Sequence, residues 1–159
     1  MVDFEILRIG SEDEFHQMLD IFELVFNDTE SFGKPTRPRT QYIQSMILNQ
    51  DFIGLLAKDR DGHAMGALAA YVLRKFEQER SEIYIYDLAV HSSVRRQGAA
   101  TALIRRLVRI AREIGSYVIF VQADKGAEDL PAQTLYRKLG VEEDVFHYDL
   151  RMDLDEADH

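Results

Sequence analysis

Runs of β-prone apolar residues mark the predicted strands of this chain. They lie at residues 4–9, 52–58, 63–73, 82–90, 117–123 and 146–152. The runs EIYIYDLAV and YVIFVQA are nearly continuous, which is typical of strands buried on both faces of a sheet. In the last run, apolar residues alternate with His147, Asp149 and Arg151, which predicts a half-exposed strand. The segment near Val141 can hold one more short strand.

Apolar residues at helical spacing predict four helices between these strands. They lie at residues 15–26, 42–47, 99–114 and 131–139. Ser11 and Glu14 form a capping box before the first helix, and Gly115 ends the third. The stretch 27–39, with one Gly and two Pro, predicts a loop. The order β, α, α, β, β, β, α, β, α, β predicts an α/β fold with a central mixed, twisted sheet flanked by helices.

The composition is that of an ordinary globular protein. The 159 residues, with 46% hydrophobic and 30% charged, fit one domain over residues 1–159, with an acidic tail at about 153–159. No apolar run is long enough to span a membrane, and the N-terminus lacks the pattern of a signal peptide. No cysteine is present, which excludes disulfides and thiolate nucleophiles. We expect a cytoplasmic protein that does not bind membranes.

Charge is unevenly distributed in this acidic chain. The formal net charge of −9 argues against general nucleic-acid binding. Arginines at 95, 96, 105, 106, 109 and 112 nevertheless follow one another with no acid between them, whereas acids predominate after Glu142. This predicts one local anion site and two ligands of opposite charge, although solvated helix and tail surfaces explain much of the asymmetry. The five histidines show no ligand spacing, and Asp59-Arg60-Asp61-Gly62 reads as a hairpin turn, so no metal site is expected.

Residues 95–101 (RRQGAAT) carry the most specific chemistry in the sequence. They lie between a predicted buried strand and the start of a helix, where unpaired N–H groups and a partial positive charge attract anions. Gly98 and the two alanines that follow allow a phosphate to approach the backbone, and Arg95 and Arg96 add charged donors. The segment is neither GxxxxGK[ST] nor GxGxxG. It predicts a pyrophosphate site, and the alternative is a helix cap with solvated arginines.

Two motifs resemble the GNAT superfamily of N-acetyltransferases. Arg95-x-x-Gly98-x-Ala100 is similar to the family's (Q/R)xxGx(G/A) loop, and residues 132–140 (AQTLYRKLG) are similar to its A-x-x-LY-x-KLGF helix, with Val141 where Phe is commoner. The resemblance implies a GNAT-type fold and acetyl-CoA as acetyl donor. The implied acetyl-CoA site comprises Leu88, Ala89, Val90, Arg95, Arg96, Gln97, Gly98, Ala99, Ala100 and Thr101.

A narrower resemblance covers about the last two-thirds of the chain. The stretches KFEQ, SEIYIYDLAV, RRQGAATALI, YVIFVQAD and LYRKLG are similar to the aminoglycoside 3-N-acetyltransferases. This resemblance implies an antibiotic-inactivating enzyme whose substrate is a polycationic aminoglycoside. The segment before residue 50 carries no comparable match, so the substrate is less closely defined than the reaction.

Acetyl transfer to an amine requires a base for the ammonium group and an acid for the departing thiolate. Tyr136 occupies the family's tyrosine position and is the expected acid, with an ordinary pKa close to that of an alkyl thiol. Asp87 is the expected base, with Glu82 as the alternative. Simpler interpretations are a core-packing tyrosine and carboxylates that pair with arginines. Because no cysteine is available as a nucleophile, direct transfer in a ternary complex is expected.

Acidic side chains are expected to attract the cationic acceptor. The candidates are Asp28, Glu30, Glu82, Asp124, Glu128 and Asp129, with Glu143 and Asp144 farther along the chain. A polyamine, another small amine or a protein amine fits such acidity equally well. A CoA-binding module without catalysis is the remaining alternative. The run 146–152 and the arginine-bearing helix can support a homodimer, which is frequent in the family.

Overall fold

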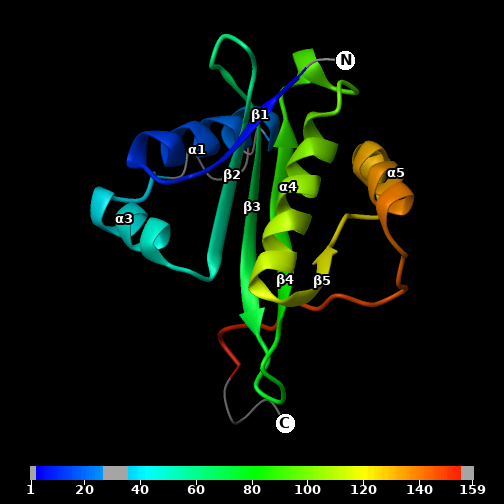
Figure 1. Ribbon diagram of the computed structural model, residues 1–159. Coiled ribbons are helices and arrows are strands. Elements are labelled where there is room, and N and C mark those ends of the chain that lie inside the picture. The colour runs from blue at the N-terminus through cyan, green and yellow to red at the C-terminus, as the bar shows by residue number, and fades with distance from the viewer. Residues whose placement is uncertain (1–2, 27–35, 155–159) are drawn as a thin grey trace. The chain divides into compact units, whose positions relative to one another are not determined.

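The computed structural model of the chain describes residues 3–26 and 36–154, and the chain divides into two compact units, residues 1–122 and 123–159. The first unit contains one five-stranded sheet in the order β1-β2-β3-β4-β5 (Figure 1). Its strands are β1 (Glu5–Arg8), β2 (Phe52–Lys58), β3 (Ala64–Arg74), β4 (Ser81–Val90) and β5 (Ser116–Val121). Its helices are α1 (Glu12–Phe26), α3 (Thr40–Leu48), α4 (Ala99–Ile114) and a short 3-10 turn at Ser92–Val94. The predicted mixed α/β sheet is thus confirmed.

The sheet is antiparallel from β1 to β4, and β5 runs parallel to β4. Only the first half of β4 pairs with β5, from Ser81 opposite Ser116 to Ile85 opposite Val121. The second half of β4, from residue 87 to 90, pairs with β3 alone. One backbone edge of this half-strand is therefore not used by β5.

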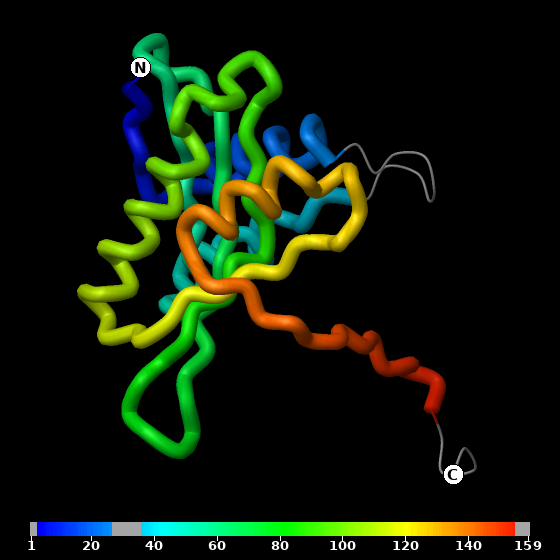
Figure 2. Tube along the Cα trace, turned by 90° about the vertical axis from the view of Figure 1, so that its right-hand side faces the viewer, coloured from blue at the N-terminus to red at the C-terminus, as the bar shows by residue number. Residues whose placement is uncertain are grey.

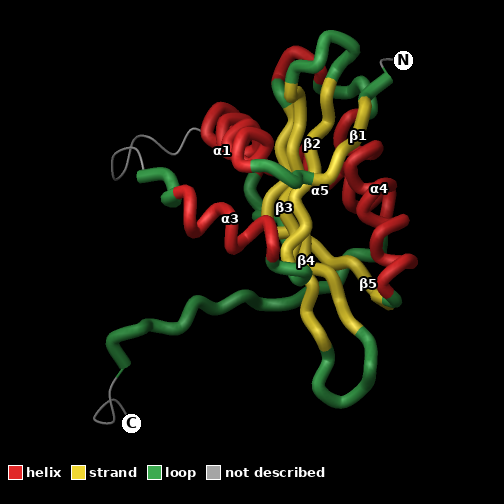
Figure 3. The backbone as a smooth tube through the Cα atoms, turned by 60° about the vertical axis from the view of Figure 1, so that its left-hand side comes forward, coloured by secondary structure: helices red, strands yellow, loops and turns green. Residues whose placement is uncertain are grey.

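Helices cover both faces of the sheet, with α1 and α3 on one face and α4 on the other (Figures 1 and 3). The α4 core is built from Ile53, Leu55, Leu68, Ile83, Ile85, Leu103, Leu107 and Ile110. The α1 core is built from Phe15, Met18, Ile21, Ile43, Leu56, Ala67, Ala69 and Ala89. Burial of both sheet faces is the main stabilising contribution to this unit.

Local signals in the sequence set the helix ends. The Glu14 N–H donates to Ser11 Oγ (3.2 Å), and the Ser11 hydroxyl donates to Glu14 Oε1 (3.0 Å), as in a capping box. Gly115 ends α4 in the left-handed conformation with φ 77°, which glycine adopts at little cost. Gly62 has φ 83° in the turn between β2 and β3, as predicted for that hairpin.

Two strands are more exposed than predicted. Alternate residues of β4 are buried, and the Tyr86 side chain is exposed. In β5, Tyr117 and Val118 are exposed. The prediction of burial on both faces was wrong because tyrosine counts as apolar in a run of letters, yet its hydroxyl commonly faces water. The turn between β3 and β4 extends past the neighbouring strands, and Phe76 within it is fully exposed (Figure 2).

The second unit contains a 3-10 turn at Ala127–Asp129 and the helix α5 (Leu130–Leu139). Pro131 lies in the first turn of α5, and Gly140 caps its end by donating its N–H to the Tyr136 carbonyl (2.8 Å). Residues 141–154 form no strand, so the strand predicted at 146–152 and the further strand near Val141 were wrong. The alternation of apolar and polar residues in this segment is typical of a strand, but a strand also requires hydrogen bonds to the edge of a neighbouring strand. Among the described residues, no helix is long and apolar enough to cross a membrane.

Candidate active site

The start of α4 leaves backbone donors available for an anion. The helix begins after Gly98, which has φ 90° and ψ 5°, and among the described residues no side chain caps it. Arg96 also has a positive φ of 64°, so the chain turns sharply before the helix. Neither Arg95 nor Arg96 forms an ion pair within residues 3–26 and 36–154, and both are exposed. This arrangement offers N–H groups, a helix dipole and two free guanidinium groups to one ligand.

The backbone at the start of α4 is open at Gly98. A Cβ added at Gly98 would meet no atom within 4 Å, so no other part of the protein fills the position. Ala99 is buried against the sheet, while Gln97 is anchored by its N–H to the Val94 carbonyl (3.3 Å). Of the predicted residues, Arg95, Arg96 and Gly98 are exposed at the N-terminus of α4, whereas the Ala99 side chain is buried. The predicted Leu88, Ala89 and Val90 lie in the half of β4 that β5 leaves unpaired.

A β-bulge in β4 determines where Asp87 points. Ile85 lies opposite Ala70 and Asp87 opposite Ala69, so Tyr86 is an extra residue with no partner on β3. Ile85 packs in the α4 core, whereas Ala89 packs in the α1 core. Because side chains alternate along a strand, Asp87 faces the α1 side together with Ala89. The bulge thus turns two consecutive side chains, Tyr86 and Asp87, toward the same face.

The Asp87 carboxylate is half-buried and has no hydrogen-bond or ion-pair partner among the described residues. Its desolvation raises the pKa above the ordinary value for aspartate. A carboxylate with a raised pKa and no protein partner is suited to accept a proton from a bound amine.

Glu82, the alternative base, is already engaged within the protein. The Tyr117 hydroxyl donates to Glu82 Oε1, and Lys75 Nζ lies 3.9 Å from the same oxygen. These contacts are of the structural kind that paired carboxylates make. The geometry therefore favours Asp87 over Glu82 as the candidate base.

Tyr136 lies in the second unit, on α5. Burial, and to a smaller extent the charge of Asp129, raises its pKa above the ordinary value for tyrosine, so the phenol keeps its proton at neutral pH. Asp129 also accepts the Asp124 N–H at Oδ2 (3.0 Å), which closes the turn before α5. Asp124 and Glu128 are exposed, and the predicted substrate residues Asp28 and Glu30 lie outside the described residues.

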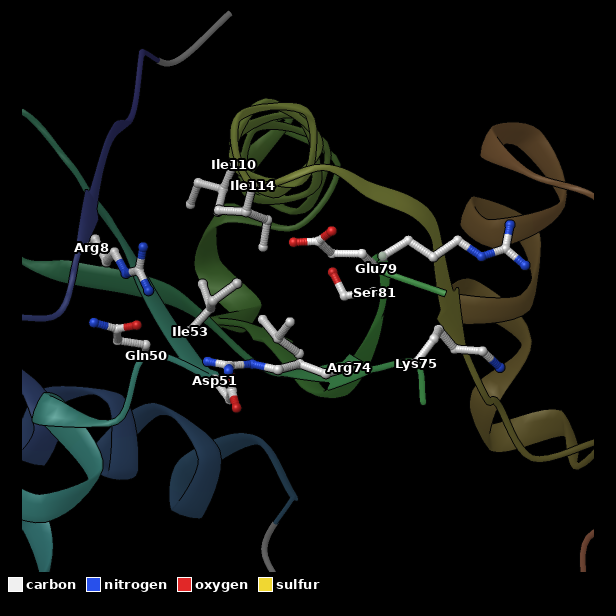
Figure 4. A pocket seen from close by; sticks show the side chains of 12 residues that line it. Arg8, Gln50, Asp51, Ile53, Arg74, Lys75, Glu79, Ser81, Ile110 and Ile114 are labelled. Atoms are coloured by element: carbon white, nitrogen blue, oxygen red, sulfur yellow. The ribbon is translucent and has the colours of Figure 1, made fainter. Parts of the chain in front are cut away.

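A pocket at the far end of α4 is separate from these residues. It lies beneath Ile110 and Ile114 in the last turns of the helix, whereas the predicted anion site is at the first turn (Figure 4). Its cations already have partners: Arg74 Nε lies 3.1 Å from Asp51, and Lys75 Nζ lies 3.3 Å from Glu77. We therefore do not assign acetyl transfer to this pocket.

In the described part of the chain, the only cluster with metal-ligand chemistry is Asp59, Asp61 and His63 in the β2–β3 turn. The Asp61 and His63 N–H groups both donate to Asp59 Oδ1, at 3.0 and 2.9 Å, which stabilises the turn. These bonds lower the pKa of Asp59, the bond from His63 most strongly. The closeness of Asp59, Asp61 and His63 is therefore explained by the hydrogen bonds of the turn.

Sequence reasoning missed the tyrosines around Asp87. The Tyr84 ring stacks on Phe120 with centroids 4.8 Å apart, and the Tyr84 hydroxyl donates to Gln122 Oε1 (3.0 Å). The Tyr86 ring contacts the rings of Tyr71 and Tyr84 at 5.8 and 5.9 Å. The letters YIYD at 84–87 carried a signal, because Asp87 follows Tyr86 directly and the alternation seen from Tyr84 to Tyr86 stops there. This departure can be interpreted only once the bulge in β4 is known.

Comparisons with known proteins show the family and the fold of the chain. Residues 15–141 match the model of the acetyltransferase (GNAT) family. No curated protein matches the chain. Among solved structures, the aminoglycoside acetyltransferase HMB0005 from an uncultured soil metagenomic sample is 46% identical with a TM-score of 0.88, over 95% of this chain and 99% of that chain.

Two further structures extend the comparison. The aminoglycoside acetyltransferase meta-AAC0020, also from an uncultured soil metagenomic sample and solved in complex with sisomicin, is 30% identical with a TM-score of 0.83, over 94% of this chain and 97% of that chain. AAC(6')-Iy, solved with a bisubstrate analogue, is 17% identical with a TM-score of 0.75, over 94% and 99% of the two chains, and shares the fold.

Proposed function

The chain belongs to the acetyltransferase (GNAT) family and is an acetyl-CoA-dependent N-acetyltransferase, and we propose that it acetylates the 3-amino group of aminoglycoside antibiotics. The observation that carries the proposal is the unpaired, half-buried Asp87 on the half of β4 that β5 leaves free. Two full-length relatives, at 46% and 30% identity, are aminoglycoside acetyltransferases and support the substrate class. The 3-position follows from the resemblance in residues 81–90 and 95–104.

Acetyl-CoA supplies the thioester, and the chain's residues hold it at the start of α4. The N–H groups from Arg96 to Thr101 would bind its pyrophosphate, with Arg95 and Arg96 neutralising charge. The free backbone edge at Leu88 and Val90 would pair with the pantetheine amides in the manner of an added strand. These contacts fix the thioester near Asp87 and convert the reaction into one between positioned groups.

Two side chains move protons in the proposed reaction. Asp87 takes a proton from the acceptor's ammonium group, which frees the nitrogen lone pair to attack the acetyl carbonyl carbon. The C–S bond then breaks as Tyr136 donates its phenolic proton to the sulfur that leaves. The nitrogen loses its second proton to the tyrosinate, which restores the phenol and leaves a neutral amide. The raised pKa of Asp87 suits the first transfer, because it makes the carboxylate a stronger base. The Tyr136 phenol is protonated at neutral pH and so has a proton to give, although burial, which raises its pKa, makes it a weaker acid than a free phenol.

Acidic side chains would concentrate the polycationic acceptor near Asp87. We assign this role to Asp28, Glu30, Asp124 and Glu128, since the carboxylates of Glu82 and Asp129 already accept hydrogen bonds. Charges of this kind act over distance and speed association, and salt screens them.

Detection of free CoA thiol tests the function directly, because the protein has no cysteine to react with the reagent. The wild-type enzyme would be assayed with acetyl-CoA and sisomicin, kanamycin, spermidine or a lysine peptide. We expect rapid thiol release with the aminoglycosides alone, and NMR of the product would locate the acetyl group. Thiol release only with spermidine or peptide would refute the aminoglycoside as substrate. A product acetylated at the 6'-amino group would refute the 3-position, and no thiol release with any amine would refute catalysis.

We also propose that the two compact units form one catalytic domain in a cytoplasmic homodimer. The family match crosses their boundary at residue 122, which supports one domain. Phe146, Tyr148, Leu150 and Met152 are exposed in the segment 141–154, and contact with a second copy would cover them. Light scattering is expected to give the mass of a dimer, and Leu150→Asp is expected to give that of a monomer.

A further inference from the structure

Three tyrosines gather beside Asp87 on the α1 face of the sheet. Tyr71 on β3 lies directly opposite Tyr84 on β4, and Tyr86, two residues farther along β4, faces the same side by alternation. The bulge adds Asp87 to this side. The Tyr86 ring meets Tyr71 edge-on, with an interplanar angle of 81°, and Tyr84 at 78°. Burial raises the pKa values of Tyr71 and Tyr84, and the neighbouring Tyr86 and, to the smallest extent, the charge of Asp87 add to the effect. The aromatic rings and the carboxylate therefore belong to one site.

The three rings differ in how firmly they are held. Tyr84 is fixed by its stack on Phe120, 4.8 Å between centroids, and by the bond from its hydroxyl to Gln122. Tyr71 packs against Phe52 with centroids 5.7 Å apart and is half-buried. Tyr86 rests against both and is 60% exposed, and in residues 3–26 and 36–154 no group bonds to its hydroxyl. Tyr86 thus presents an open ring on a rigid aromatic support, next in sequence to the candidate base.

We propose that Tyr86 is a positioning residue for the acceptor, with its ring as the platform on which the protonated amino sugar lies while Asp87 faces the ammonium group. The inference rests on the proposed function and adds a residue to it. An ammonium group over an aromatic face is attracted by the ring quadrupole, and the apolar edges of a sugar ring can pack against the same face. Because Tyr86 and Asp87 are consecutive, an amine seated on the ring has its charge close to the carboxylate.

The Tyr86 ring and the acidic side chains would have different roles in binding the acceptor. Carboxylates attract any cation from a distance, polyamines included, whereas an aromatic platform orients a ring-shaped acceptor at contact. The bulge has a clear role in this arrangement. Without it, alternation would send either Tyr86 or Asp87 into the α4 core, and the platform and the base would lie on opposite faces.

Three variants separate the ring from its hydroxyl and from general surface changes. Tyr86→Leu removes the ring and keeps an apolar side chain, and Tyr86→Phe keeps the ring and removes the hydroxyl. Phe76→Leu is the matched control, since Phe76 is a fully exposed aromatic residue in the turn between β3 and β4. Titration calorimetry with sisomicin would be done on each protein saturated with CoA, so that no turnover occurs. Initial rates with acetyl-CoA and sisomicin would be measured in parallel.

We expect Tyr86→Leu to weaken sisomicin binding about 5- to 30-fold, with CoA binding unchanged, and Tyr86→Phe to restore most of the loss. Phe76→Leu should bind as the wild type does. Two results would overturn the inference in a preparation whose wild type catalyses acetyl transfer. One is wild-type affinity for sisomicin in Tyr86→Leu, and the other is an affinity loss in Tyr86→Phe equal to that in Tyr86→Leu. Ring-dependent binding without acetyl transfer by the wild type would refute the function and leave the inference standing. No sisomicin binding by the wild type would overturn both.

Discussion

Replacing Gly98 by alanine tests the anion site at the start of α4. Gly98 has φ 90°, a conformation that costs an L-residue about 1–2 kcal/mol. In a protein of this size, 1 kcal/mol shifts Tm by about 2–4 °C, so we expect a fall of about 2–8 °C. The added methyl group meets no protein atom within 4 Å, so steric conflict inside the protein adds nothing to this cost.

The methyl group would instead occupy space that the phosphates of acetyl-CoA need. Loss of one hydrogen bond to a charged group costs ~1.5–3 kcal/mol, which corresponds to an increase of about 10- to 150-fold in the KM for acetyl-CoA. Gly115→Ala is the control, because Gly115 has φ 77°, an equally open Cβ position and a place at the other end of α4. It should lose similar stability and keep the wild-type KM.

Thermal unfolding and initial rates at varied acetyl-CoA would be compared for the two variants. If Gly98→Ala and Gly115→Ala lose equal stability and both keep the wild-type KM for acetyl-CoA, the placement of the phosphates at Gly98 is refuted. Full wild-type stability in both variants would refute the argument from backbone conformation.

The remaining predictions concern the two proton-transfer groups. Asp87→Asn should lower kcat by about 10²- to 10⁴-fold with little change in the KM for acetyl-CoA, and an unchanged kcat would remove the base assignment. The same variant should be more stable than the wild type at pH 7. The folded state raises the pKa of Asp87, so it binds the proton more tightly than the unfolded state does, and ionisation of the carboxyl above that pKa costs stability. The Tm difference should therefore shrink as the pH falls through the raised pKa toward the ordinary carboxyl value, and a difference independent of pH would contradict this account. Tyr136→Phe should lower kcat on the order of 10²-fold with the KM for acetyl-CoA unchanged, whereas wild-type kcat would show that another group protonates the thiolate.

Short-range signals made most of the fold predictable. The capping box at Ser11 and Glu14, the turn at Gly62 and the end of α4 at Gly115 depend on a few neighbouring residues, and all three formed as expected. The strand at 146–152 failed because alternation describes the segment alone and carries no information about a partner edge. Burial of β5 was overestimated because the run of letters counts Tyr117 as apolar and carries no information about what covers the strand.

The candidate site was predictable only in part. The helix start after Gly98 could be predicted because its residues are consecutive, and the anion site proposed there stays a prediction. The orientation of Asp87 could not, because the extra residue in β4 appears only when β4 is aligned with β3. Contacts between distant residues were likewise hidden: no local pattern pairs Tyr84 with Phe120 or Gln122.

One further long-range contact was also hidden. Arg37 donates to Glu23 through Nε (3.2 Å) and Nη2 (3.0 Å), it also donates to Asp20, and its Nη1 lies 3.1 Å from His16 Nδ1. All three partners lie on α1, whose last residue is Phe26. The chain therefore leaves α1 at residue 26 and is fastened back to the same helix at residue 37.

This fastening bears on how the enzyme can evolve. The candidate acceptor residues Asp28 and Glu30 belong to the stretch whose two ends α1 holds. Closing a loop costs only about 0.6 kcal/mol more for each doubling of its length. A change in the length of the connection between residues 26 and 37 therefore adds little entropic cost, and the core of the described residues lies on the sheet and its helices. We propose that selection by a new antibiotic can change the sequence of this stretch while the candidate base Asp87 on β4 is inherited unchanged.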